Sequence, residues 1–176
     1  MKKTAFAVTA HDDLLIAHKI WMFTDDLLSI ELRVWTYHAG AAHGNSVTHT
    51  LNFRVNPPLQ IGLGDVFSPD HLSRDYLGLL SKFCIADLHE QQSRHFSDPK
   101  EREEALAVIQ DDWILKGAGS NPDNFGGFAL TQDGLRIFFD PYQVGSYAEG
   151  RYEVLVPYSV LAPLLSDDIK LLASAK

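Results

Sequence analysis

The sequence has a single cysteine, no long apolar run and no cluster of basic residues. Cys84 has no second thiol to pair with, so an internal disulfide and zinc motifs built on several cysteines are excluded. No apolar stretch reaches the roughly 20 residues that span a bilayer as a helix. With 15 Lys and Arg against 23 Asp and Glu, the net charge is −8, so the surface repels phosphate and nucleic acid is not an expected partner.

Motifs of the common enzyme classes are also missing. The chain has no Gly-x-Ser-x-Gly elbow, no phosphate-binding loop and no His-Glu-x-x-His pair, and no cofactor is predicted. Acidic residues are plentiful, so a hydrolase that uses paired carboxylates is an alternative, although nothing singles out one pair. Cys84 lies on the apolar side of an expected helix and is interpreted as a buried thiol rather than a nucleophile.

The composition is that of one globular domain. Hydrophobic residues make up 45% of the 176 residues and aromatic residues 11%, enough for a core, so residues 1–176 are predicted to form a single domain. The chain opens with two lysines, but the apolar stretch 5–10 is too short for the core of a signal peptide. An ordinary strand or chain end is expected there.

Alternating apolar and polar residues predict an antiparallel meander near the start of the chain. Strands are expected over residues 14–22, 28–34 and 47–55. The aliphatic faces that begin at Leu14, Leu28 and Val47 are expected to form the buried face. Matching these faces across the first two strands places Lys19 opposite Glu31, an opposite-charge pair that supports this register.

Trp21 and Trp35 fall on the other face of these strands. If that face is uncovered, the two indoles mark a binding surface. If other elements cover it, they belong to the core, which is where most tryptophan side chains are found.

The second half of the chain carries helix and hairpin signals. A capping residue followed by proline predicts helices from Ser68 and from Asp98 onward. Asp133-Gly134 between apolar alternations predicts a hairpin, a last strand is expected over residues 152–156, and Pro157 opens a short helix. The predicted fold class is α+β, mainly antiparallel β-sheet with two or three helices packed on one face.

Three stretches carry a resemblance to a known family. They are LLSIELRVWTYHAGAAHGN, LQIGLGDVF and FALTQDGLRIFFDPYQVGSYAEGRYEVLVPYSVL. Together, between roughly residues 14 and 165, they resemble the domain found at the C-terminal end of RsiV-type anti-sigma factors and in the N-terminal part of PdaC-type peptidoglycan deacetylases. Where that family has a Gly-Gly pair in its loop, this chain has Gly40-Ala41.

The resemblance implies a bacterial envelope domain in a periplasmic or extracytoplasmic location. In RsiV-type proteins this domain binds lysozyme, and in PdaC-type proteins it accompanies a catalytic domain. The partners implied for this chain are therefore a lysozyme-type protein or a cell-wall glycan. We predict a non-catalytic binding domain, with a polysaccharide-acting hydrolase or a purely structural, oligomerising domain as alternatives.

The loop 38–45 is the first predicted ligand site. Its small residues expose backbone groups that a ligand can approach, and two imidazoles flank it. The residues assigned to ligand binding are His38, Gly40, His43 and Asn45. The competing interpretation is a tight connection in which His43 orders the loop by hydrogen bonds.

The segment 140–150 is the second predicted ligand site, with Asp140, Tyr142 and Tyr147 assigned to it. The two tyrosines offer flat amphipathic faces that suit sugars or proteins. The competing interpretation is a folding corner with buried tyrosines, in which Asp140 accepts N–H groups of the turn.

A zinc site at His38, His43 and His49 is not predicted. His49 lies on the apolar strand face while the other two lie in a loop, and no carboxylate within that loop completes the shell. A core histidine satisfied by one hydrogen bond is the expectation for His49.

Overall fold

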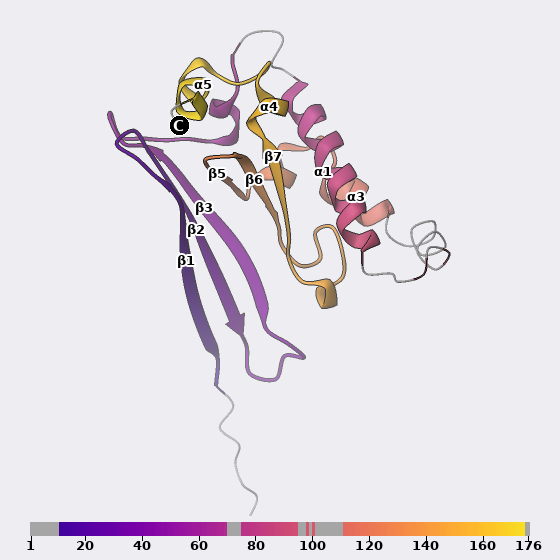
Figure 1. Ribbon diagram of the computed structural model, residues 1–176. Coiled ribbons are helices and arrows are strands. Elements are labelled where there is room, and N and C mark those ends of the chain that lie inside the picture. The colour runs from indigo at the N-terminus through magenta and orange to yellow at the C-terminus, as the bar shows by residue number, and fades with distance from the viewer. Residues whose placement is uncertain (1–10, 70–74, 95–97, 99, 101–110, 175–176) are drawn as a thin grey trace, which may run out of the picture.

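The computed structural model describes residues 11–69, 75–94, 98, 100 and 111–174, and it places two antiparallel sheets and a helical layer side by side (Figure 1). The first sheet has the order β1-β2-β3-β4 and the second the order β5-β6-β7. The strands are β1 Asp13–Phe23, β2 Leu27–Tyr37, β3 Asn45–Arg54, β4 Leu59–Gln60, β5 Phe128–Leu130, β6 Gly134–Phe139 and β7 Tyr152–Pro157. The α-helices are α1 Tyr76–Ser93, α3 Asp111–Gly117, α4 Tyr158–Leu161 and α5 Asp167–Ser174.

The first three strands form the predicted meander. Ile16 lies opposite Val34, and Lys19 lies opposite Glu31, so the predicted register of the first pair is confirmed. A β-bulge between Ile20 and Met22 interrupts this register. A bulge inserts an extra residue and turns the side chains beyond it, and Met22 accordingly reaches the buried face, opposite Ser29.

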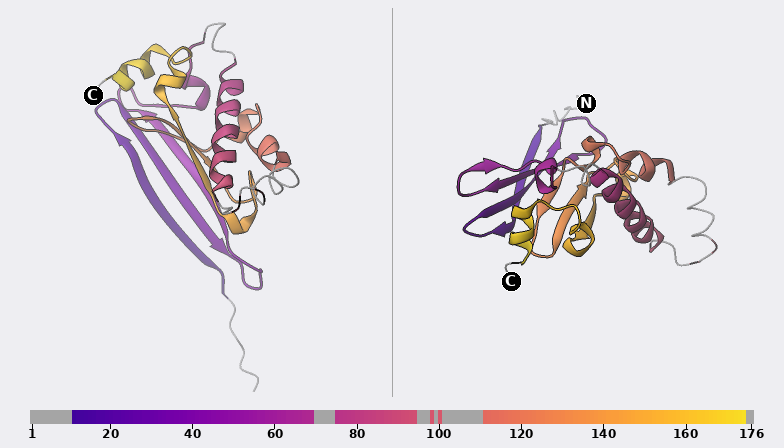
Figure 2. Two further views of the ribbon diagram at one scale, coloured as in Figure 1. Left: turned by 45° about the vertical axis from the view of Figure 1, so that its right-hand side comes forward. Right: turned by 90° about the horizontal axis from the view of Figure 1, so that it is seen from above.

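The expected buried face of this meander was wrong. Leu14, Ile16 and Ile20 are 65%, 58% and 53% exposed, whereas Leu27 and Ser29 on the other face of the sheet are buried. Figure 2 shows the second sheet against one face of the first sheet. This is the face that carries the tryptophans, since the Trp21 ring lies 5.9 Å from the ring of Phe138 of β6, and the exposed aliphatic face looks outward. Alternation alone identifies two faces but not which of them meets the rest of the chain.

The second sheet begins with the predicted hairpin. β5 and β6 pair through Phe128 opposite Ile137, with Asp133-Gly134 between them, and β7 adds on the far side. A Cβ at Gly134 would lie 2.2 Å from the carbonyl oxygen of Val156, so the close approach of β7 requires glycine at this position. The hairpin and the last strand are confirmed.

The helical layer covers the second sheet. α1 packs against β7 and α3 against α1. Cys84 on α1 is fully buried, which confirms the predicted buried thiol, and this burial raises the pKa of the thiol. None of the helices within the described ranges is long and apolar enough to cross a bilayer.

Some sequence predictions concern residues beyond this description. The start of the chain, residues 1–10, and most of the helix expected from Asp98 lie outside the described residues. The first residues of the helix expected from Ser68 also fall partly on residues 70–74, outside the described ranges, and α1 itself spans Tyr76–Ser93. The α+β class is confirmed, and its strands are divided between two sheets rather than gathered in one.

A polar seam joins the two sheets along β5. The side chain of Asn52 donates to the Phe128 carbonyl (2.9 Å) and accepts from the Ser29 hydroxyl (2.6 Å). Leu130 N–H donates to Ser29 Oγ (3.0 Å), and Phe128 N–H donates to Thr50 Oγ1 (3.2 Å). Side chains of the first sheet thus satisfy the backbone of an edge strand that is buried at the interface.

This seam predicts a large stability loss for Asn52→Ala. The substitution leaves the buried Phe128 carbonyl without its donor and the Ser29 O–H without its acceptor, so the free energy of unfolding should fall by about 2–3 kcal/mol. Asn45→Ala at the exposed start of β3 is the control and should change it by less than about 0.5 kcal/mol. Urea denaturation of both variants measures the difference; equal effects would contradict the role of the seam.

Candidate functional site

The loop between β2 and β3 meets the corner between β6 and β7 at an aromatic cluster. The rings of His43 and Tyr147 stack with centroids 3.9 Å apart, and Tyr142 lies 5.6 Å from Tyr147. Trp113 on α3 extends the group, with its ring 6.3 Å from that of Tyr142. We call His43, Trp113, Tyr142 and Tyr147 the aromatic cluster; its members come from three segments far apart in the sequence.

Hydrogen bonds fix the orientation of the His43 ring. Its Nδ1 lies 2.8 Å from the Gly44 carbonyl, so Nδ1 carries the proton. In the neutral ring Nε2 is then an acceptor, and the Tyr142 hydroxyl, 3.2 Å away, donates to it. The Tyr147 hydroxyl donates to the same Gly44 carbonyl (2.8 Å), so the loop and the corner are tied together.

Tyr142 combines exposure with backbone strain. Its φ is +73°, the left-handed region that side chains with a Cβ rarely adopt, and it is the only described non-glycine residue with a positive φ. Its side chain is 52% exposed. Strain of this kind costs about 1–3 kcal/mol and persists at sites where the surroundings impose it, often for function.

A small hollow adjoins the strained tyrosine. It has a volume of about 180 Å³ and is lined by Trp113, Lys116, Tyr142 and Gln143. The Gln143 side chain donates to the backbone carbonyls of Gly117 (3.0 Å) and Asn124 (2.9 Å). These two hydrogen bonds hold Gln143 in place at the hollow. The hollow therefore offers two aromatic faces and polar side chains within the space of a single sugar ring.

A second, more open groove lies on the tryptophan-bearing face of β1, β2 and β3, which we call the inner face. It has a volume of about 490 Å³ and is lined by Leu15, Ala17, Arg33, Trp35 and Ser46. Trp35 closes the side toward the loop, where a Cβ on Gly44 would lie 2.4 Å from its ring. Trp35 also stacks on Tyr37, with centroids 6.4 Å apart. The tryptophan face is thus partly core and partly open.

The predicted site residues separate into two groups. His43, Tyr142 and Tyr147 come together in the aromatic cluster. His38 instead lies 3.4 Å from Asp12, whose pKa is held below its usual value first by the Ala39 N–H and then by His38. Gly40 takes a left-handed φ of +88°, and Asn45 is the exposed first residue of β3.

Asp140 has a different partner from the one expected. Its carboxylate accepts from the Thr48 N–H (2.9 Å) and the Thr48 hydroxyl (2.6 Å) on β3, rather than from N–H groups of its own turn. Asp140 was expected to accept N–H groups of its own turn, and this expectation was wrong. Asp140 fastens the start of the corner to the first sheet.

The described histidines are not grouped around a common metal position. In the described ranges, no group of three or more His, Cys, Asp or Glu side chains is placed to hold an ion. His49 was expected in the core, but it is exposed on the outer face of β3 opposite Leu32. The expectation failed because the aliphatic face of the meander looks outward.

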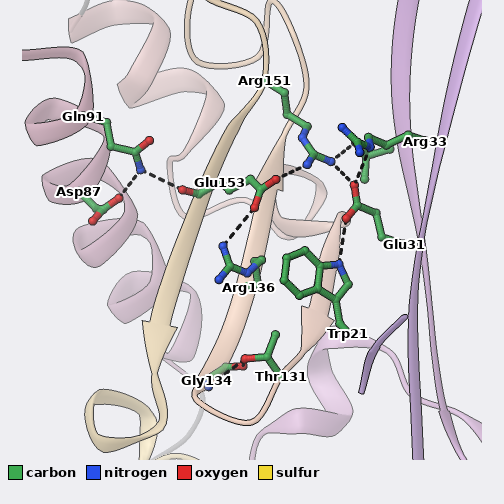
Figure 3. Close-up of polar contacts among 11 residues, drawn as sticks. Trp21, Glu31, Arg33, Asp87, Gln91, Thr131, Gly134, Arg136, Arg151 and Glu153 are labelled. Atoms are coloured by element: carbon green, nitrogen blue, oxygen red, sulfur yellow. Dashed lines mark hydrogen bonds and ion pairs between the residues drawn. The ribbon is translucent and has the colours of Figure 1, made fainter. Parts of the chain in front are cut away.

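A buried charge network, which the sequence analysis missed, fastens the other end of the corner (Figure 3). Glu31 is 1% exposed and forms ion pairs with Arg151 and Arg33, while Trp21 Nε1 donates to it at 2.9 Å. Arg151 also pairs with Glu153. The register places Glu31 on the same face as Trp35, but only the docking of the second sheet buries this part of that face, so the sequence alone did not reveal the network.

Comparisons with known proteins agree with this fold. A family model described as "Protein of unknown function (DUF3298)" matches residues 64–159. Two solved structures of DUF3298 family members are similar: one from Bacteroides fragilis (TM-score 0.63, 24% identity, 92% of this chain and 57% of that chain) and one from Pseudomonas aeruginosa (TM-score 0.58, 19% identity, 88% and 62%). At these identities they show the fold alone.

Curated relatives are longer than this chain. The peptidoglycan-N-acetylmuramic acid deacetylase PdaC of Bacillus subtilis is 26% identical over 160 residues, which cover 90% of this chain and 30% of PdaC. The immunogenic protein MPT64 of Mycobacterium tuberculosis is 40% identical over 53 residues, 30% of this chain and 23% of that protein. The chain spans less than a third of either relative. The expected resemblance to PdaC-type proteins is confirmed.

The contact between Gly44 and Trp35 predicts that Gly44→Ala is disruptive. The added methyl group overlaps the indole, so the free energy of unfolding should fall by about 1–3 kcal/mol and the near-UV circular dichroism of the tryptophans should change. At Gly126 the nearest atom is 3.7 Å from an added Cβ, so Gly126→Ala should leave both unchanged. An unaltered tryptophan signal in Gly44→Ala would refute the packing.

The positive φ of Tyr142 predicts an inverted order of stabilities. Glycine normally costs stability relative to alanine, but at this backbone angle Tyr142→Gly should be more stable than Tyr142→Ala by about 1 kcal/mol. Both variants lose the same ring contacts, so their difference isolates the backbone. Thermal and urea unfolding measure it, and an Ala variant as stable as the Gly variant would show that the strain is absent.

Proposed function

The chain belongs to the DUF3298 family, and from this premise we propose that it is a non-catalytic, extracytoplasmic domain of the bacterial cell envelope that binds glycan strands of peptidoglycan at the aromatic cluster. The observation that carries the proposal is the exposed and strained Tyr142, which faces a hollow shared with Trp113. Aromatic rings stack on the apolar faces of sugars, while side chains such as Lys116 supply polar contacts.

The similarity to PdaC supports this ligand class. That relative is named as a peptidoglycan deacetylase, and 90% of the present chain aligns with it. A non-catalytic role is supported by the buried Glu31 and the half-buried Glu153, since both carboxylates form ion pairs with arginines. These two carboxylates are thus engaged in structural contacts, which supports a binding role over an acid-base one.

A protein ligand such as a lysozyme is the second candidate, and the net charge favours it. At −8 the chain would attract a basic protein at long range, and that attraction weakens as salt screens it. Binding that depends on charge alone would disappear at physiological salt. Binding through the aromatic cluster would persist.

Co-sedimentation with purified peptidoglycan sacculi tests the proposal. The domain should pellet with sacculi at physiological salt, and Tyr142→Ala or Trp113→Ala should weaken binding by about tenfold or more, because truncating a central aromatic anchor costs above about 1.4 kcal/mol. Phe23→Ala is the matched control. Phe23 is an aromatic residue, 75% exposed, at the end of β1 away from the β2–β3 loop, so its substitution should leave binding unchanged.

Calorimetry with a basic lysozyme in parallel separates the two candidates. Saturable lysozyme binding at physiological salt, together with no binding to sacculi, would overturn the glycan proposal in favour of a protein partner. Loss of sacculus binding in Phe23→Ala to the same extent as in Tyr142→Ala would remove the aromatic cluster as the site.

A further inference from the structure

Within the described residues, β1 is an edge strand of the first sheet. Among the strands that the structure describes, β1 is hydrogen-bonded to β2 alone, and every residue from Asp13 to Ile20 is exposed. The β-bulge after Ile20 ends this regular stretch. On the side away from β2, alternate residues of this stretch direct their backbone N–H and C=O groups outward in extended form, which is the surface on which another strand adds to a sheet.

The side chains along this edge are apolar on both faces of the sheet. Leu14 and Ile16 are 65% and 58% exposed on the outer face, and Leu15 is 63% exposed on the inner face. Exposed apolar residues on a regular edge favour pairing with a further strand. We propose that a second copy of this chain pairs with β1 through its own β1, antiparallel, with a two-fold axis at Ile16.

The charges on β1 select this register. A two-fold axis normal to the sheet keeps each residue on its own face, so only positions of like parity can oppose each other. An axis at Ile16 places Asp13 opposite Lys19 of the second copy, twice by symmetry. An axis one residue away in either direction places Asp13 or Lys19 opposite an apolar side chain and loses both pairs. The sequence of β1 is thus complementary to itself in one register.

The dimer has a consequence for the inner face. Leu15 and Ala17, which line the 490 Å³ groove, would lie beside Ala17 and Leu15 of the second copy, so the two grooves would join across the axis. Because the rotation preserves faces, both aromatic clusters would lie on one side of a continuous sheet. Two sites on one side bind a repetitive polymer with avidity, although the dimer itself does not depend on the glycan proposal.

Sedimentation velocity over a concentration series tests the association. The mass should rise from 19.7 kDa toward twice that value. Asp13→Lys replaces two attractions with two repulsions and should shift the midpoint to an at least about tenfold higher concentration. Asp25→Lys makes the same charge change in the exposed β1–β2 turn and should shift it by less than about twofold. A constant mass of 19.7 kDa, or equal shifts in the two variants, would overturn the proposal.

Cysteine cross-linking tests the register independently. In Ile16→Cys the two introduced thiols face each other across the axis, within the Cα separation of about 4.5–5.5 Å that a disulfide accepts. In Leu14→Cys, a similarly exposed position on the same face, they lie about 13 Å apart, four residues at roughly 3.3 Å each. Cys84 is buried and does not interfere. Rapid covalent dimer formation in Ile16→Cys alone supports the register; equal cross-linking, or none, would refute it.

Discussion

The buried carboxylate of Glu31 is the constraint on which the arrangement of the site depends. A charge removed from water is tolerated only when it is paired and hydrogen-bonded, so Arg151 and the Trp21 indole must lie against it. Arg151 follows directly on the corner between β6 and β7, and Asp140 at the start of that corner binds Thr48 of β3. The corner is therefore fastened to the first sheet at both ends.

That double attachment explains the aromatic cluster. With its ends fixed, the corner brings Tyr147 onto His43 and holds Tyr142 at a backbone angle that an unconstrained chain avoids. The strain at Tyr142 is offset elsewhere, by the ion pairs and the polar seam between the sheets. Residues that never touch a ligand thus determine the geometry of the residues proposed to do so, and this is why the site faces one side of the molecule.

Much of the fold follows from sequence pattern, and the errors have one physical origin. The meander, the Lys19–Glu31 register and the Asp133-Gly134 hairpin depend on local alternation and turn chemistry, which a sequence displays directly. Which face of the meander is buried depends on where the second sheet docks, and no local pattern encodes that. For the same reason, the burial of Glu31 was missed and His49 was expected in the core instead of on the surface.

We propose that the corner between β6 and β7 and the 38–45 loop together bind a glycan. Nuclear magnetic resonance tests this proposal residue by residue. The isotope-labelled domain would be titrated with a soluble fragment of a peptidoglycan glycan strand. Saturable shifts are expected at the Trp113 indole and at His43, Tyr142 and Tyr147, with the outer face of β1 unaffected. Shifts confined to that outer face, or no shifts at millimolar ligand, would contradict it.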